Sequence, residues 1–206
     1  MRGAAIVYGK SRVFFGVVMG KVLSTLAVGL CLSAPAGAAA AQATGPAPLF
    51  PVDEVRIGLY DHNVEPHGSE AGVDVKGELL FGRLPGGYGS PILETILRPR
   101  PHVGGNINFS GHTSFAYAGL TWDYRLSPSF FLEASFGAAV HDGPLDERGK
   151  ASFGCRANFH EQAGLGYAID RNWRVVLSWE HMSNADLCDR NRGLTNAGVR
   201  IGYVFD

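Results

Sequence analysis

The feature that most constrains the fold is an alternation of apolar and polar residues that recurs along most of the chain. About eight segments alternate with a period of two, the period of a β-strand, and clusters of Gly, Pro, Asp or Asn separate them. They span residues 54–63, 72–83, 102–109, 113–126, 129–141, 157–168, 172–183 and 194–205. The longest irregular stretch, residues 85–101, is rich in Pro and Gly. An all-β protein is therefore predicted.

Each of these segments has one bulky apolar face and one face of charged residues and glycines. Between residues 172 and 183 the odd positions are apolar: Trp173, Val175, Leu177 and Trp179. The even positions include Arg174, Ser178 and Glu180. Two architectures fit this pattern. In a soluble barrel or sandwich the apolar face forms the core, whereas in a membrane barrel it contacts lipid and the charges fill the interior.

Three features favour the membrane barrel. Glycines mixed with charges of both signs suit a narrow lumen better than a solvated face. Aromatic residues lie near the segment ends, as in interfacial girdles: Tyr124, Phe130, Trp173, Trp179, Tyr203 and Phe205. The chain also ends in an aromatic strand, RIGYVFD. Residues 54–206 are therefore predicted to form an eight-stranded antiparallel transmembrane β-barrel whose interior is filled by side chains.

The N-terminal segment has the features of a secretory signal peptide. Residues 1–41 contain Arg2, Lys10, Arg12 and Lys21 and no acid, and an apolar stretch then ends in small residues. A membrane anchor helix is the alternative, but Pro35 interrupts the apolar part. Residues 42–53 are expected to be a short lead-in. The predicted location is the outer membrane of a Gram-negative cell, reached after cleavage of residues 1–41.

Charge and cysteine usage narrow the function classes. Four of the 18 Lys and Arg lie in residues 1–41, which leaves 14 against 19 acids, a net charge of −5. This balance argues against a nucleic-acid partner. Two cysteines remain in the exported part, Cys155 before segment 157–168 and Cys188 after segment 172–183. A hairpin of these segments would bring them together as a disulfide. No zinc-ligand spacing or phosphate loop is present, so no metal and no cofactor are expected.

His181 and Ser183 are the residues best suited to nucleophilic chemistry. Residues i and i+2 of a strand point to the same side, so both share the face of Trp179. A serine hydroxyl needs a base within hydrogen-bond reach, and His181 could accept its proton. Asn184 and backbone N–H groups near it could stabilise an oxyanion. In a membrane barrel this pair would face lipid.

The segment EHMSNADLCDRNRGLTNAGVRIGYVF, residues 180–205, resembles the C-terminal block of the lipid A 3-O-deacylase family, the PagL type of acyloxyacyl hydrolase-like barrels. The shared features are His-x-Ser-Asn-Ala at 181–185, Asn191, Gly193 and the closing Gly-x-x-x-Gly-Tyr-x-Phe strand. The resemblance implies an outer-membrane enzyme that hydrolyses the ester-linked acyl chain at the 3 position of lipid A. Serine would be the nucleophile, histidine the base and a glutamate the third member.

The sequence departs from the family at this third member. The family has its glutamate twelve residues after the serine, where this chain has Thr195. Glu161 is the best replacement, because a three- or five-residue hairpin loop would place it opposite His181 on the same face. A two-residue loop would place His160 there instead.

Three other acids fit the third position less well. Glu180 is expected to point into the lumen, toward Arg174 or Arg200, because its parity is opposite to that of His181. Asp186 and Asp189 lie in the following loop, and nothing in the sequence holds them near the histidine.

The predicted function is hydrolysis of lipid A, or of lipopolysaccharide, by Ser183, His181 and Glu161, with Asn184 and Asn191 as oxyanion or positioning residues. Two alternatives remain open. One is a catalytically inactive structural barrel of the same family, and the other is an exported soluble lipid-binding barrel. Whether the barrel forms a homodimer is also left open.

Overall fold

The computed structural model describes residues 51–65, 70–147 and 152–205. The predicted signal peptide, residues 1–41, and nearly all of the predicted lead-in lie outside the described residues. Both therefore remain predictions. Within the described residues, no helix is both long and apolar enough to cross a membrane.

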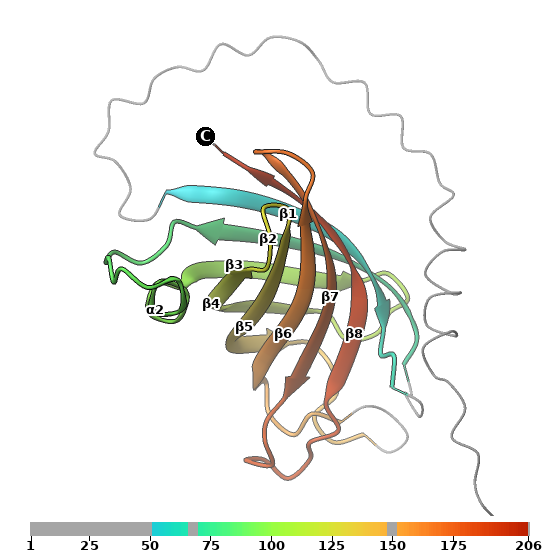
Figure 1. Ribbon diagram of the computed structural model, residues 1–206. Helices are drawn as coiled ribbons and strands as arrows, with labels where there is room; N and C mark the ends of the chain where they lie inside the picture. Colours follow the sequence, from blue (N-terminus) through green and yellow to red (C-terminus); the bar gives the residue numbers. More distant parts are fainter. Residues whose placement is uncertain (1–50, 66–69, 148–151, 206) are drawn as a thin grey trace, which may run out of the picture. The chain divides into compact units, whose positions relative to one another are not determined.

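Eight antiparallel strands close into a barrel in chain order, with β8 paired to β1 (Figure 1). The strands are β1 Val52–His62, β2 Gly72–Phe81, β3 Arg100–Asn108, β4 Phe115–Arg125, β5 Phe130–His141, β6 Ala157–Ala168, β7 Trp173–Ser183 and β8 Leu194–Val204. The eight-stranded antiparallel barrel predicted from the alternation is confirmed. Predicted and observed ends differ by two residues at most, because period-two alternation and turn residues mark strands locally.

The barrel is apolar outside and polar inside. Ile57 and Leu177 on the outer face are 63% and 60% exposed, whereas Arg56, Lys76 and Glu180 inside are no more than 2% exposed. This arrangement rules out the soluble lipid-binding barrel considered above, since that barrel would turn its apolar face inward. An outer surface of large apolar side chains is stable only against lipid or a comparable apolar phase.

A cluster of buried ion pairs fills part of the interior. Arg200 contacts Glu78 and Glu133 through its two terminal nitrogens, each at 2.6 Å. Arg56 lies 2.7 Å from Glu133 and 3.3 Å from Glu78. All four side chains are at most 1% exposed. Each charge therefore has at least two partners of opposite sign, which offsets the cost of removing it from water.

Glu180 points into the lumen as predicted, but its predicted partners are wrong. It pairs with Lys76 and lies 3.2 Å from the His160 ring, rather than contacting Arg174 or Arg200. Lys76 is on β2, across the barrel from β7 in the chain order. A cross-lumen contact of this kind depends on barrel closure, which a strand-by-strand pattern does not describe.

One helix interrupts the stretch that the sequence suggested was irregular. Helix α2, Pro91–Leu97, begins with Ser90 and Pro91 at its N-terminus and carries Glu94 in its first turn. It lies on the outside of the barrel near β4 (Figure 1), where the Trp122 indole N–H donates to the Ile96 carbonyl at 3.0 Å. A helix of seven residues in a stretch rich in Pro and Gly is too short to show the helical period in the sequence.

The two ends of the barrel differ. Aromatic contacts join Phe130 to Tyr167 and Trp173 to Tyr203 at the end where β1 begins and β8 ends. At the opposite end, loop residue Phe153 is fully buried in an apolar cluster. The cluster consists of Phe115, Tyr117, Ala139, Phe153, Met182 and Leu194. His181 and Ser183 lie at this second end, because β7 ends there.

Candidate active site

The β6–β7 hairpin sets the register at the end of β7. Ala168 pairs with Arg174, and the Ile169 N–H bonds to the Trp173 carbonyl at 2.9 Å, which leaves three residues in the turn. In this register Glu161 lies directly opposite His181, and Phe159 lies opposite Ser183. The predicted placement of Glu161 rather than His160 beside His181 is confirmed. His160 instead points into the lumen, where it is 1% exposed.

His181 and Ser183 share the outer face of β7 with the exposed Trp179. Both residues are half-buried. The Ser183 side chain makes no hydrogen bond to any described residue, so its hydroxyl is unengaged. In the absence of substrate, the hydrogen bond between a nucleophile and its base is often long, and it shortens when the substrate binds. The geometry therefore offers an uncommitted hydroxyl two positions from an imidazole on a surface that faces outward.

The hydrogen bond of His181 goes to β8. Thr195 is the β8 residue opposite His181, and its Oγ1 lies 2.8 Å from the ring Nδ1. The same Thr195 hydroxyl donates to Glu65 Oε1 at 2.6 Å. Glu65 follows β1 and was not among the candidates from sequence. It is 130 positions from Thr195 in the chain, and only the pairing of β8 with β1 brings the two together.

Glu161 is half-buried on the outer face and, among the described residues, has no hydrogen bond to His181. Cross-strand neighbours have Cβ atoms about 5 Å apart, so a carboxylate at this position remains within reach of the ring. Its assignment as the third member of a triad stays a prediction.

Gly193 lies against the other edge of the His181 ring. Its φ is +73°, and a Cβ placed on it would come within 2.9 Å of His181 Cε1 and 3.4 Å of Nε2. Glycine is favoured here for two reasons, because its backbone is left-handed and because the imidazole occupies the space that a side chain would need.

We expect Gly193→Ala to displace the His181 ring and to lower the esterase activity predicted from the sequence by about tenfold or more. The left-handed backbone at this position adds a strain of about 1–2 kcal/mol. Gly111→Ala is the matched control, since Gly111 also has a positive φ (+81°) but no atom within 4 Å of the added Cβ. The unfolding temperatures of both variants should be measured first, so that activities are compared at a temperature at which both are folded. Equal activity in the two variants would show that the space beside the ring is unimportant.

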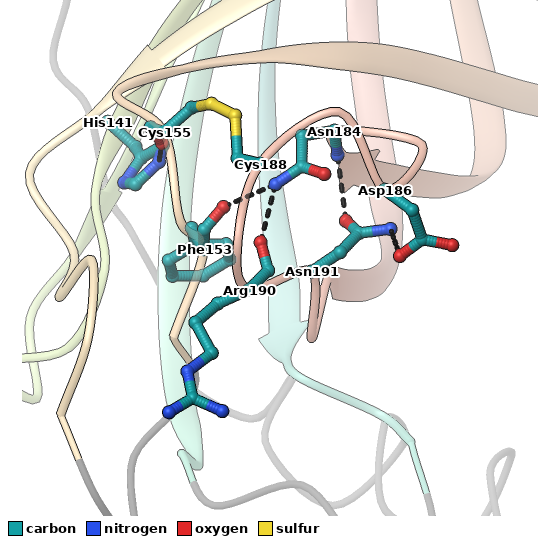
Figure 2. The surroundings of a disulfide bond; sticks show 8 residues. All are labelled: His141, Phe153, Cys155, Asn184, Asp186, Cys188, Arg190 and Asn191. Atoms are coloured by element: carbon teal, nitrogen blue, oxygen red, sulfur yellow. Dashed lines mark hydrogen bonds between the residues drawn. A yellow bond between two sulfur atoms is a disulfide. The ribbon is translucent and has the colours of Figure 1, made fainter.

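Asn184 and Asn191 hold the loop that follows β7 (Figure 2). The Asn184 side-chain amide donates to the Phe153 and Arg190 carbonyls, both at 2.6 Å, and its backbone N–H donates to Asn191 Oδ1 at 2.8 Å. All three N–H groups of Asn184 are therefore engaged in loop contacts. In this conformation none of them is left to bind an oxyanion. The contacts of Asn184 hold the loop that follows β7.

A disulfide joins Cys155 to Cys188, with Cα atoms 6.0 Å apart, as predicted from the hairpin (Figure 2). It links the β5–β6 loop to the β7–β8 loop. In the second loop Asp186 accepts a hydrogen bond from the Asn191 side chain at 3.0 Å, and Asp189 is exposed. No described contact joins either aspartate to His181. The disulfide and the asparagines together secure the loop next to Ser183.

A closed eight-stranded barrel with an apolar outer surface and ion pairs inside has the architecture of outer-membrane β-barrel proteins. The family model described as "Lipid A 3-O-deacylase (PagL)" matches residues 103–204, which include both members of the His–Ser pair. The chain belongs to this family.

Among solved structures, the barrel is similar to that described as "Crystal structure of the outer membrane enzyme PagL". The TM-score is 0.55 at 17% sequence identity, over 73% of this chain and 99% of that one. This similarity supports the fold. Two further similarities have lower scores: a de novo designed transmembrane β-barrel (TM-score 0.46, 15% identity, 75% and 98% covered) and the outer-membrane protein Ail of Yersinia pestis (0.41, 15%, 75% and 99%). A search of the curated proteins found no match.

Proposed function

We propose that this protein is an outer-membrane esterase that hydrolyses the ester-linked 3-O acyl chain of lipid A, with Ser183 as nucleophile and His181 as general base. One observation carries the proposal: the His–Ser pair lies on the apolar outer surface of a barrel of this family, with the histidine Nδ1 already hydrogen-bonded. An active site that opens onto the outer surface suits a substrate that stays in the membrane.

The chemistry follows from the two ring nitrogens of His181. With Nδ1 bonded to Thr195, Nε2 is the nitrogen that can accept the Ser183 proton as Oγ attacks the acyl carbonyl. The protonated ring then donates that proton to the departing 3-oxygen of the sugar, which leaves as a hydroxyl. Water, deprotonated by the same nitrogen, releases the acyl chain from Ser183 as a carboxylic acid and restores the enzyme.

The surface around the pair fits an amphiphilic substrate. Trp179, two residues before His181 on the same face, is 55% exposed, and Leu177 is 60% exposed. Acyl chains can lie along this apolar strand while the ester reaches the strand end where Ser183 is located. Because the acyl chains are already in an apolar phase in the membrane, this contact orients the substrate and is not driven by removal of the chains from water.

The supporting residues act on the loop and on the ring. Asn184 and Asn191 position the loop beside Ser183 through the contacts described above, and oxyanion stabilisation by Asn184 would require its amide to leave the Phe153 or Arg190 carbonyl. Glu161, opposite His181, is the third member predicted from the hairpin, and Glu161→Gln tests whether its carboxylate acts on the imidazole. All the residues proposed for this site belong to one chain, so the proposal does not require a homodimer.

Mass spectrometry of lipid A from cells with and without this protein tests the proposal. We expect the protein to remove one 3-hydroxyacyl chain from lipid A, with the matching free 3-hydroxy fatty acid appearing in the lipid extract. Heat-modifiable gel migration and outer-membrane fractionation would show in the same cells that the barrel has folded and been inserted. Unchanged lipid A in cells that contain the folded barrel would support the inactive structural barrel instead.

A further inference from the structure

The three residues that follow the last β1 position are held against the start of β8. The Asn63 N–H donates to Asn196 Oδ1 at 2.9 Å, and the Val64 N–H donates to the Thr195 carbonyl at 2.8 Å. Asn63 has a φ of +54°, a left-handed conformation that asparagine tolerates better than most residues. These contacts bring Glu65 next to the Thr195 side chain. The position of Glu65 is therefore fixed by hydrogen bonds of the preceding backbone N–H groups, in addition to its own side-chain contact with Thr195.

The Thr195 hydroxyl connects Glu65 to His181 in a defined direction. A hydroxyl has one proton to donate, and a carboxylate can only accept, so the 2.6 Å bond to Glu65 uses that proton. At the 2.8 Å contact with His181, Thr195 Oγ1 must therefore accept, and ring Nδ1 must donate. This order places the proton on Nδ1 and leaves the lone pair on Nε2, the tautomer that a general base requires.

Burial strengthens this chain of hydrogen bonds. Thr195 is only 4% exposed, so its hydroxyl has little opportunity to exchange partners with water. A hydroxyl that donates to an anion becomes a better acceptor for the next donor, and a low local dielectric increases the effect. The negative charge of Glu65 is thereby felt at the imidazole although the two groups are not in direct contact.

We infer that Glu65 is the positioning carboxylate of this active site and that it acts on His181 through the Thr195 hydroxyl. The inference rests on the proposed esterase function and deepens it. It accounts for an active site in which threonine occupies the register position opposite the histidine on β8, since the carboxylate is supplied by the β1–β2 loop instead. It also distinguishes Glu65 from Glu161, which flanks His181 on the β6 side without a hydrogen bond to it.

Steady-state kinetics of purified variants on lipid A in mixed micelles test the inference. Glu65→Gln removes the charge, Thr195→Val removes the hydroxyl at nearly constant shape, and Thr195→Ser restores the hydroxyl. Asp189→Asn is the matched control, because Asp189 is an exposed carboxylate of the β7–β8 loop with no described contact to His181. Glu161→Gln is the competing variant, because it neutralises the other carboxylate beside His181. Glu65→Gln combined with Thr195→Glu, which places a carboxylate opposite the ring, is the rescue. Heat-modifiable migration of each variant confirms folding.

We expect Glu65→Gln and Thr195→Val each to lower kcat by about 100-fold with KM within about twofold. That loss is smaller than the ~10⁴-fold loss for an acid bonded directly to its histidine, because Glu65 acts on the ring through a hydroxyl and not by direct contact. Thr195→Ser and Asp189→Asn should keep kcat within about threefold of that of the unmodified protein, and Glu161→Gln should lower kcat less than Glu65→Gln does. The rescue variant should have a kcat at least tenfold above that of Glu65→Gln. A kcat loss for Glu161→Gln with Glu65→Gln unaffected would overturn the inference.

A measurement without turnover separates this inference from the proposed function. Nitrogen-15 NMR of the His181 ring reports which nitrogen carries the proton. We expect Nδ1–H in the unmodified protein and in Glu161→Gln, and a mixture of tautomers in Thr195→Val. If the unmodified protein fails to hydrolyse lipid A, the proposed function is wrong, and the ring tautomer still decides whether the Glu65–Thr195–His181 connection exists. A proton on Nε2 in the unmodified protein would disprove it.

Discussion

Ser183→Ala is expected to lower kcat for release of the 3-hydroxyacyl chain by at least ~10³-fold, since the covalent route is lost and only substrate binding and transition-state contacts remain. KM should change little, because the substitution removes one oxygen at a half-buried position and leaves the outer surface of β7 intact. The Ser183 hydroxyl makes no hydrogen bond to a described residue, so its removal should not weaken the fold. The measurement is fatty-acid release by the purified barrel in lipid A micelles.

Ser129→Ala is the matched control for this prediction. Ser129 lies in the turn between β4 and β5, at the end of the barrel away from the site, and the same atom is removed. We expect its kcat to equal that of the unmodified protein. Equal fatty-acid release by Ser183→Ala and the unmodified protein would exclude Ser183 as the nucleophile and leave the His–Ser pair without a catalytic role.

Arg200→Met is expected to lower the free energy of unfolding by about 3–5 kcal/mol, because it leaves buried carboxylates short of a counter-charge. Arg200 bonds to Glu78 and Glu133 at 2.6 Å each, and its Nε donates to the Ser178 hydroxyl at 2.9 Å. Methionine fills much of the same volume without a charge. Arg56 then becomes the remaining guanidinium in contact with both glutamates.

Urea unfolding of the barrel in detergent micelles, followed by tryptophan fluorescence, measures this loss. Arg171→Met serves as the control, since Arg171 is an exposed arginine in the β6–β7 turn and should change stability by no more than about 0.5 kcal/mol. A further substitution, Glu133→Gln, should recover part of the loss in Arg200→Met by removing one unpaired charge. A loss below about 1 kcal/mol would indicate that water or a lumenal rearrangement compensates for the missing arginine.

The strands could be predicted from the sequence, whereas the contacts inside the barrel could not. Alternation of side chains is a local property, so the outward position of His181 and Ser183 and the inward position of Glu180 follow from parity alone. The partner of Glu180 was predicted wrongly as Arg174 or Arg200, because Lys76 reaches it across the lumen from β2. Helix α2 was missed because seven residues between Pro and Gly show no clear helical period.

The part of the site that lies in the β6–β7 hairpin could be predicted from the sequence. The short turn after β6 limited the register to a few choices, and parity selected the one that places Glu161 beside His181. The same hairpin predicted the disulfide between Cys155 and Cys188. Both are relations between segments that are adjacent in the chain, where the length of one connection sets the distance.

The contact of Glu65 with the site could not be predicted in this way. Its contact with Thr195 spans 130 residues and exists because β8 pairs with β1 when the barrel closes. The sequence by itself determined a barrel with an apolar outer face and a His–Ser pair on that face, because two-residue periodicity assigns every side chain to one side. Only the tertiary structure decided which acidic side chain joins the histidine, because closure brings together the first and last strands, whose separation along the chain is greatest.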